Sequence, residues 1–358
     1  MVKRFTVQKL SKLSNILQQK MKSILAIGNA ITDIPVCLPD DSLLKELDFT
    51  LGSMNHVDAN KAAQVWEKIR GCDMKYIQGG SAANTIVVAA QLGMKCGFVG
   101  KIGDDPVGEV FRKGMEDEGV ECSLFKGTQP SGRAVAFITP PNGERTFATY
   151  LGAALEQHPS ELDERMFEGY DYFHVEGYLM QCPGVVEKAV EIAKGKDMTI
   201  SFDMGSCGIV KRYRETVSRM VAEYSDIVFA NELEALEFVS SAGIDSRSDS
   251  WAVDALEYIH GQMKKGGNEA PVAVVKLGAQ GSLVTDGNDV YRVDALPVEV
   301  IDTTGAGDAY AAGFLYAHSK GADLQGCGKG GALLASRVVS QLGPKIPAAN
   351  IVSLKAGF

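Results

Sequence analysis

The sequence lacks long apolar segments, and its cysteines and histidines are not spaced for metal binding. None of its hydrophobic runs reaches the roughly 20 residues that a membrane-spanning helix needs. The seven cysteines are scattered, odd in number and never arranged as CxxC, and the five histidines are dispersed. Zinc sites and disulfide frameworks need regular spacing, so neither is expected, and the cysteines indicate reduced thiols in a cytoplasmic protein.

Positive charge is also scarce. Lysine and arginine total 36 against 45 aspartates and glutamates, which gives a formal net charge of −9. This balance argues against broad nucleic-acid binding, which needs a basic face. A small anionic ligand is still compatible with it, because a local pocket can be positive on an acidic protein. We therefore expect a small-molecule ligand, without nucleic acid or membrane as a partner.

The N-terminal segment differs from the rest of the chain. Its first twenty residues carry five lysines and arginines and no acidic residue. An organellar targeting peptide can have this composition, but the segment lacks arginine richness. We interpret residues 1–21 as an N-terminal extension and keep a targeting peptide as the alternative. The whole chain is 45% hydrophobic, which is the composition of an ordinary globular protein, and we expect residues 22–358 to form its folded part.

Short apolar runs alternate with helical patterns after Met21. Helical spacing occurs at 184–196 and at 106–119, where Asp104 or Asp105 is the expected cap and Gly119 the stop. Such alternation predicts an α/β fold in which a mainly parallel sheet is covered by helices on both faces. The expected strands of this sheet are residues 23–28, 96–100, 170–177, 198–203, 226–230 and 271–278.

Two regions break this alternation, at about 33–80 and at 131–150. The second contains PNG (141–143) between two alternating runs, which is typical of a β-hairpin. We predict that strands from both regions lie outside the main sheet and form one small β layer over its edge.

The stretch DTTGAGDAYAAGFLYA places glycines before a run of small and apolar residues. We expect a strand at 298–302, a loop at 303–307 and a helix at 309–317. The first turn of a helix has unpaired N–H groups and the positive end of the backbone dipole. Glycines let a ligand approach those groups closely, so the sequence predicts an anion site, most plausibly for phosphate.

Asp308 follows these glycines directly. A carboxylate repels phosphate unless it faces a hydroxyl group that loses its proton while attacking phosphorus. In that position it would accept the proton, and the neighbouring amides would stabilise the transferred group. The alternative is a helix cap without chemistry, and the motif alone does not separate the two.

Two further polar residues follow predicted strands. Asn84 lies in GGSAANT, where a strand runs into a small-residue helix, and an amide can donate to and accept from a polyol. Asp33 lies in GNAITDI after the first strand and could accept hydrogen bonds from two vicinal hydroxyls. The alternatives are a tight turn before a packed helix for Asn84, and a solvated or capping carboxylate for Asp33.

Two motifs suit a nucleotide and its metal ion. In NELE, Asn231 and Glu234 lie three residues apart on one helical face and could hold a hydrated Mg²⁺ through its waters. The same spacing also fits a capping box. The glycine turn KLGAQGS (276–282) could shape a nucleotide pocket or simply join a hairpin.

Taken together, these residues resemble a known family. GGSAANTIVVAAQLGMKCGFVGKIGDDPVGEVFRKGMEDEGV and DTTGAGDAYAAGFLYA are similar to the two signatures of the ribokinase-like (PfkB-type) carbohydrate and nucleoside kinases, and NELE lies between them in the expected order. The resemblance covers essentially everything after Met21. Within the family, GNAITDI and GERTFATYLGAA look most like the adenosine kinases.

The resemblance implies a ribokinase-like three-layer sandwich with a small β-sheet lid. Residues 22–358 would form the kinase domain, with the lid made by about 33–80 and 131–150. The activity implied is transfer of the ATP γ-phosphate to a hydroxymethyl group of a sugar or nucleoside, with Mg²⁺. The resemblance leaves open a monovalent cation such as K⁺, and a monomer or a homodimer.

The family pattern also implies roles for residues of this sequence. Asp308 would be the general base, and Gly305, Ala306 and Gly307 would supply the anion hole. Residues expected to bind the acceptor are Asn29, Asp33, Gly79, Gly80, Asn84 and, reaching from the lid towards the phosphates, Arg145. Residues expected near the nucleotide are Asn231, Glu234, Lys276, Gly278, Gly281 and Thr304, with Glu234 also expected to hold Mg²⁺ through water. An exposed hairpin position is the alternative for Arg145.

One position departs from the adenosine kinase pattern. Those enzymes place paired aromatic residues after the strand that corresponds to YFHVEG, and one of them stacks on adenine. Here Tyr178 is followed by Leu179, so a free sugar remains open as the acceptor.

Other functions fit less well. The first strand is not followed by the GxGxxG of a nicotinamide dehydrogenase, and no GxxxxGK[ST] loop occurs. GGSAA (79–83) breaks the serine hydrolase motif GxSxG at its last position. A catalytically silent sugar- or nucleoside-binding protein on the same scaffold is the remaining alternative, although the base and the anion hole are intact.

Overall fold

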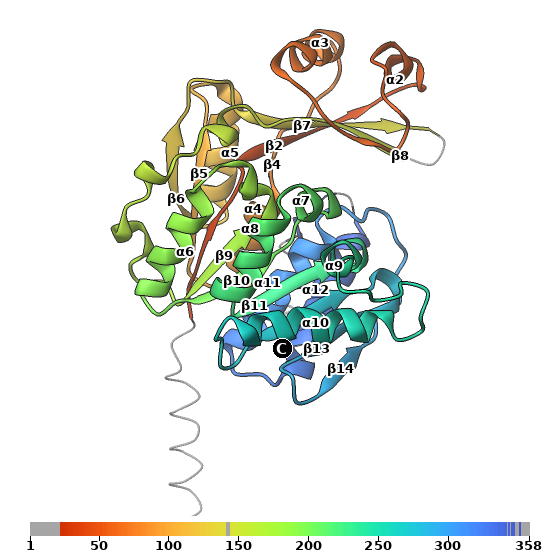
Figure 1. The fold of residues 1–358 in the computed structure, drawn as a ribbon. Helices are drawn as coiled ribbons and strands as arrows, with labels where there is room; N and C mark the ends of the chain where they lie inside the picture. Colours follow the sequence, from red (N-terminus) through yellow and green to blue (C-terminus); the bar gives the residue numbers. More distant parts are fainter. Residues whose placement is uncertain (1–21, 141–143, 342, 344, 348–350, 352–358) are drawn as a thin grey trace, which may run out of the picture.

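A computed structural model describes residues 22–140, 144–341, 343, 345–347 and 351. The described strands form one sheet of nine strands and one of five, as the sequence predicts (Figure 1). The predictions for residues 1–21 and for the turn at 141–143 lie outside the described residues. Within the described part of the chain, no helix is long and apolar enough to span a membrane.

The larger sheet contains all six strands expected for it. Every neighbouring pair is parallel, except that β13 runs antiparallel to both β12 and β14. Its central strands are buried on both faces, which explains their nearly continuous apolar runs. The order across the sheet is β14 (Val290–Val293), β13 (Ser282–Thr285), β12 (Val272–Lys276), β11 (Ile227–Asn231), β10 (Thr199–Asp203), β9 (Tyr172–Glu176), β1 (Ile24–Ile27), β5 (Cys96–Ile102) and β6 (Val120–Lys126).

Helices cover both faces of this sheet and complete three layers (Figure 1). Asp105 caps one of them by accepting a hydrogen bond from the Gly108 N–H, as the sequence predicts. One face packs against α4 (Ser81–Gln91), α5 (Pro106–Asp117), α11 (Ala306–Ser319) and α12 (Leu324–Val339). The other packs against α6 (Val185–Gly195), α7 (Cys207–Arg212), α8 (Arg214–Arg219), α9 (Glu232–Val239) and α10 (Trp251–Lys265).

Short helical turns join these elements. Five are 3₁₀ turns and η5 is a single π-helical turn. They are η1 (Gly152–Glu156), η2 (Pro159–Glu161), η3 (Glu164–Phe167), η4 (Gly177–Gln181), η5 (Met220–Tyr224) and η6 (Gly278–Gln280).

The smaller sheet draws strands from both of the regions that break the alternation. Its β7 and β8 pair antiparallel up to Thr139 and Glu144, which confirms the predicted hairpin. Helices α2 (Ser42–Glu46) and α3 (Ala59–Ile69) cover the side that faces away from the main body (Figure 1). The order is β3 (Met54–His56), β8 (Glu144–Tyr150), β7 (Gly132–Thr139), β2 (Ile31–Cys37) and β4 (Ile77–Gly79).

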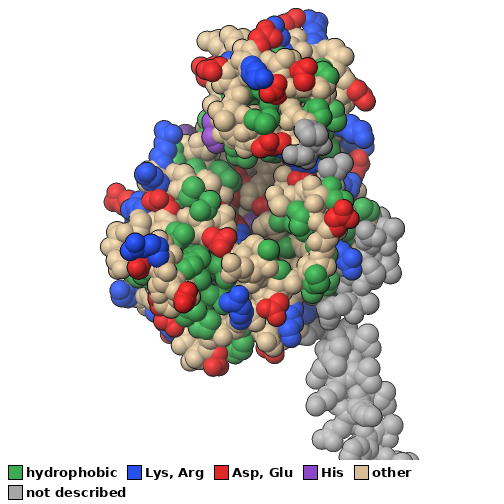
Figure 2. Space-filling view, turned by 90° about the vertical axis from the view of Figure 1, so that its right-hand side faces the viewer, with side chains coloured by type: hydrophobic (Ala, Val, Ile, Leu, Met, Phe, Trp, Pro, Cys, Tyr) green, Lys and Arg blue, Asp and Glu red, His purple; other side chains and the backbone are tan. Residues whose placement is uncertain are grey.

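The chain crosses between the two sheets four times. Two crossings are long, at 127–131 between β6 and β7 and at 151–171 between β8 and β9. Two are short: residues 28–30 join β1 to β2, and Gly80 joins β4 to α4. Figure 2 shows the surface hollowed between the part of the molecule that holds the smaller sheet and the main body, and the short crossings lie at the junction of these two parts.

Two local predictions around the glycine motif are wrong. Residues 298–302 form no strand, and Val300 and Ile301 are 63% and 54% exposed. Their alternating pattern finds no neighbouring strand, and the N–H groups of Ile301 and Asp302 bond instead to the carbonyl of Val339. Helix α11 begins at Ala306, earlier than expected, because Gly305 already acts as its N-cap.

Candidate active site

The carboxyl ends of five parallel strands meet at one edge of the larger sheet. In open α/β sheets, ligands bind in the crevice outside these ends. The polar residues that end or directly follow the strands here are Asn29 after β1, Glu176 on β9, Asp203 on β10, Asn231 on β11 and Lys276 on β12. Helices α4 and α11 begin at the same edge.

The first turn of α11 presents free backbone donors. Gly305 caps the helix in the left-handed conformation, with φ 76°, which a glycine adopts without strain. Among the described residues, the N–H groups of Gly305, Gly307 and Asp308 have no hydrogen-bond acceptor, whereas that of Ala306 bonds to Thr303. Three unpaired donors at the positive end of a helix dipole form an anion site.

Asp308 does not cap its own helix. Its Oδ1 accepts a hydrogen bond of 2.7 Å from the Ser81 hydroxyl, and its Oδ2 accepts one of 2.9 Å from the Asn84 amide. Both donors lie on α4, so the carboxylate is oriented from a helix that follows the first glycine cluster. Asn84 is thus placed against Asp308, and the sequence reasoning missed Ser81, whose position in GGSAAN marks the start of the same helix.

Opposing effects set the acidity of this carboxylate. Burial raises the pKa of Asp308 to about 6, against the hydrogen bonds from Asn84 and Ser81. This net pKa of about 6 also includes the charge of Asp203, which acts upwards, and the Lys276 ammonium, which acts downwards. The group is therefore ionised at neutral pH and close enough to its pKa to take up a proton.

A second buried carboxylate, Glu176, was not predicted. It is 1% exposed and accepts hydrogen bonds from both nitrogens of Asn29, at 2.8 and 2.9 Å, and from the Ala82 N–H at 2.7 Å. Because Gly80, the N-cap of α4, has no side chain, Glu176 supplies the missing acceptor at that helix end. Burial raises its pKa to about 7.

Asn29 keeps one polar atom free. Among the described residues, its buried Oδ1 has no hydrogen-bond partner, although its amide nitrogen is fixed by Glu176. A buried acceptor without a hydrogen-bond partner is unfavourable. It is therefore available to a hydroxyl group of a ligand.

The glycines before α4 allow close packing at the junction of the two sheets. Gly80 has φ 96°, and a Cβ there would collide with the carbonyl of Asn29. A Cβ on Gly79 would collide with the carboxylate of Asp33. These glycines thus seat Asp33, on β2 of the smaller sheet, beside the larger one.

Asp33 lies within the electrostatic reach of Asp308. Burial, with the charges of Asp308 and Asp302 acting in the same direction, raises its pKa to about 7. Arg145 acts in the opposite direction. The two aspartates, 275 positions apart by number, thus share one acidic neighbourhood.

Arg145 joins the smaller sheet to the glycine motif. From β8, its Nη1 lies 2.6 Å from the carboxylate of Asp302 and 3.2 Å from the Thr304 hydroxyl. The Asp302 side chain is only 3% exposed and also accepts hydrogen bonds from the N–H groups of Thr304 and Gly343. Arg145 is therefore not a free surface charge, and it fixes the smaller sheet over the loop that precedes the anion site.

Asn231 and Glu234 form a capping box at the start of α9. Both Glu234 oxygens accept hydrogen bonds from Asn231, at 2.7 and 2.6 Å. Burial and the charge of Asp203 raise the pKa of Glu234 to about 7. The structure thus confirms that Asn231 and Glu234 form a capping box. Binding of a metal ion by the same residues stays a prediction.

The donor set at this edge fits a hydrated magnesium ion better than a directly bound one. Three carboxylates, those of Asp203, Glu234 and Asp308, surround a single ammonium, that of Lys276. Within the described residues, no three acidic, histidine or cysteine side chains lie close enough to ligate a metal directly. Mg²⁺ usually retains several of its waters, so contact through water suits this excess of negative charge.

Lys276 is held by Asp203, which the sequence reasoning also missed. The ammonium lies 2.6 Å from the Asp203 carboxylate. Beyond Lys276, the η6 turn begins at Gly278 and is followed by Gly281, between antiparallel β12 and β13, so KLGAQGS joins a hairpin, which was one of its two alternatives. Their place near a nucleotide stays a prediction.

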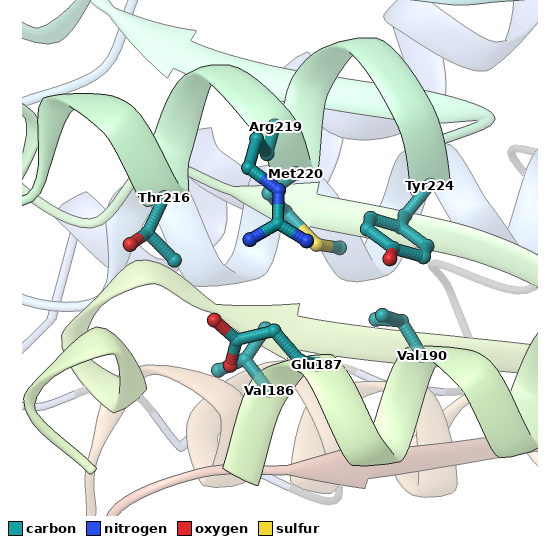
Figure 3. Close-up of a pocket in the computed structure, with 7 residues that line it drawn as sticks. All are labelled: Val186, Glu187, Val190, Thr216, Arg219, Met220 and Tyr224. Carbon is teal, nitrogen blue, oxygen red and sulfur yellow. The ribbon is translucent and has the colours of Figure 1, made fainter. Parts of the chain in front are cut away.

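Hollows elsewhere do not involve the predicted residues. Figure 3 shows one between α6 and the α8–η5 helix, where Glu187 and Arg219 point towards each other. Another is lined by His260 and the turn between β13 and β14. No residue predicted for the active site lines either hollow.

Comparison with known proteins identifies the fold and its chemistry. Residues 49–350 match the model of the pfkB family of carbohydrate kinases. The chain belongs to this family. Membership implies a phosphotransferase with an alcohol acceptor and use of ATP, and it confirms the resemblance seen in the sequence.

Relatives within the PfkB family differ in their acceptors. The chain is 29% identical over 272 residues to a nucleoside kinase of Methanothermobacter thermautotrophicus, covering 75% of this chain and 81% of the relative. It is 32% identical over 281 residues to a 5-dehydro-2-deoxygluconokinase of Bacillus velezensis, covering 75% and 80%. The crystal structure of adenosine kinase from Sinorhizobium meliloti superposes with a TM-score of 0.81 at 31% identity, covering 95% of this chain and all of that one.

Proposed function

We propose that this PfkB family protein is a kinase that transfers the γ-phosphate of ATP to a hydroxymethyl group of a sugar or nucleoside. One observation carries the proposal. The carboxylate of Asp308 is fixed by Ser81 and Asn84 beside three unpaired N–H groups at the start of α11. A base and an anion hole side by side suit the attack of an alcohol on phosphorus.

In the proposed reaction, the acceptor oxygen forms a bond to the γ-phosphorus and its proton moves to a carboxylate oxygen of Asp308. The bond between that phosphorus and the bridging oxygen breaks, and its electron pair leaves with ADP. The N–H groups of Gly305 and Gly307 stabilise charge on the transferred group. Arg145 holds the smaller sheet over this site, and its guanidinium lies near the oxygens of the transferred phosphoryl group.

The proposal assigns the remaining predicted residues as follows. Asp33 and the free Oδ1 of Asn29 accept hydrogen bonds from the hydroxyls of the acceptor. Asn231 and Glu234 hold Mg²⁺ through water, and the ion supplies neutralising charge to the phosphates when bound. Thr304 and the η6 turn lie towards the nucleotide. The same proposal divides residues 22–358 into a core and a lid, with the lid at about 33–80 and 131–150. It also includes a requirement for a monovalent cation.

The acceptor is best identified by a direct assay. We expect ADP release in the presence of Mg²⁺-ATP and at least one member of a panel of ribose, fructose, other free sugars and purine nucleosides. Because Tyr178 is the only aromatic residue of GYLM, both sugars and nucleosides belong in the panel. Tight binding of a panel member without any ADP release would instead favour a silent binding protein.

The pH dependence of turnover tests the base. Asp308 accepts a proton only when ionised, and burial raises its pKa to about 6. We therefore expect kcat/KM for the acceptor to fall as the pH drops through about 6, well above the ordinary range of an aspartate. Initial rates measured at saturating Mg²⁺-ATP across about pH 5–8 give this profile. A rate that stays constant down to about pH 5 would contradict the assignment.

A further inference from the structure

We propose that Lys276 contacts the transferred phosphate and that Asp203 is the positioning residue that holds its ammonium there. The inference rests on the proposed kinase function and adds to it a charge pair that joins two strands. It explains how the ammonium of Lys276 is held at the site.

The pair lies across the carboxyl edge of the larger sheet. Lys276 ends β12 and Asp203 ends β10, with β11 between them. The lysine side chain crosses the end of that strand to bring Nζ within 2.6 Å of the Asp203 carboxylate, and the two side chains are 13% and 7% exposed. The ammonium is therefore directed by Asp203 and not by its own strand.

The same ammonium lies against the anion site. A Cβ added to Gly307 would stand 3.1 Å from Nζ and 3.9 Å from Cε of Lys276. Gly307 and its neighbours Gly305 and Asp308 carry the unpaired N–H groups of α11. The ammonium and the helix end thus face the same small space.

Charges of both signs act on the ammonium at this position. The positive end of the α11 dipole repels a cation. Burial lowers the pKa of Lys276, but the charges of Asp203, Glu234 and Asp308 outweigh it and raise that pKa. These carboxylates thus offset the repulsion of the helix end, and an anion held between the ammonium and the helix end would interact favourably with both.

The ammonium also has donors to spare. It carries three N–H groups, and among the described residues only Asp203 accepts a hydrogen bond from it. Two donors remain for a phosphate oxygen. The competing explanation is a purely structural pair, which apolar or neutral residues of similar size can often replace without loss of stability.

The test compares Lys276→Met with the double variant Asp203→Asn/Lys276→Met, in which no buried carboxylate is left unpaired. We expect both to lose kcat by about 100-fold. We also expect about tenfold weaker binding of a non-hydrolysable ATP analogue with Mg²⁺, because a hydrogen bond to a charged group is lost. ADP, which lacks the γ-phosphate, should bind as it does to the wild type. Binding is measured by calorimetry and folding by thermal denaturation.

The acid limb of the kcat/KM profile for the acceptor separates the effects of the two residues. The charge of Lys276 lowers the pKa of Asp308 and that of Asp203 raises it, so Lys276→Met should move the limb to higher pH and Asp203→Asn to lower pH. Asp203→Asn should also lower kcat, because the ammonium is no longer held. The other charged or titratable groups around Asp308, all unchanged in these variants, are Asp33 on β2, Glu176 on β9, Tyr178 on η4 and Glu234 on α9.

The outcomes are distinguishable from failure of the proposed function. A folded double variant with wild-type kcat and wild-type affinity for the ATP analogue would overturn the inference while leaving the kinase intact. If the wild type transfers no phosphate, the ratio of analogue to ADP affinity still reports the contact. If the wild type binds neither nucleotide, both the inference and the proposed function are overturned.

Discussion

Asp308→Asn is expected to lower kcat by about 10³-fold with little effect on the fold. The amide has the size of the carboxylate, but it cannot take up the proton of the acceptor hydroxyl. Since the wild-type group is ionised at neutral pH, the loss should be greatest there. Steady-state rates with the identified acceptor measure it.

Two control measurements test whether the loss of kcat comes from the missing base alone. Thermal unfolding shows whether the exchange disturbs the contacts with Ser81 and Asn84, and binding of an ATP analogue shows whether the nucleotide site is intact. A folded, nucleotide-binding variant that retains more than about a tenth of wild-type turnover would leave Asp308 without a role as base.

Arg145→Ala is expected to lower kcat by about 100-fold and to destabilise the closed arrangement of the two sheets. The change leaves the carboxylate of Asp302 buried without its cation, which is strongly unfavourable. It also removes the guanidinium beside the anion site. Turnover and thermal unfolding are measured together, because we expect both to fall.

Two further variants separate the two proposed effects of Arg145, which are to hold the smaller sheet in place and to contact the phosphates directly. Arg145→Lys keeps the charge but loses the planar fork, so we expect partial recovery of stability and little recovery of kcat. Asp302→Asn breaks the ion pair and leaves the guanidinium in place. If Asp302→Asn lowers kcat as much as Arg145→Ala does, the arginine acts only through closure, and a direct effect on the phosphates is contradicted.

The sequence predicted the parts of the fold that depend on local patterns. Apolar runs located six of the nine strands of the larger sheet, and a polar cap expected at Asp104 or Asp105 located the start of α5. Residues 298–302 show the limit of this reasoning. They have the composition of a strand, but a strand also needs a neighbour, and the partner or its absence is a property of the whole fold.

The site was predictable where glycines mark the backbone and not where side chains meet across elements. The motif 305–308 predicted the free N–H groups at the start of α11, since bare backbone and a helix start lie within four residues. Asp203 and Glu176 were missed because each ends a strand like many other acids, and their partners lie 73 and 147 positions away. For Asn231 and Glu234, which lie only three residues apart, the short spacing predicted their contact. It did not decide between a capping box alone and an additional role in binding Mg²⁺.

The crossings between the sheets at residues 28–30 and at Gly80 have a mechanical consequence. Asn29 and the start of α4 adjoin these two crossings and both contact Glu176, so a movement of the smaller sheet about the crossings would displace them as well as Asp33. If the smaller sheet opens to release product, as the proposed lid implies, the candidate site would come apart with it. Water entering the open protein would then not meet an assembled site, and ATP would be protected from hydrolysis without a separate gate.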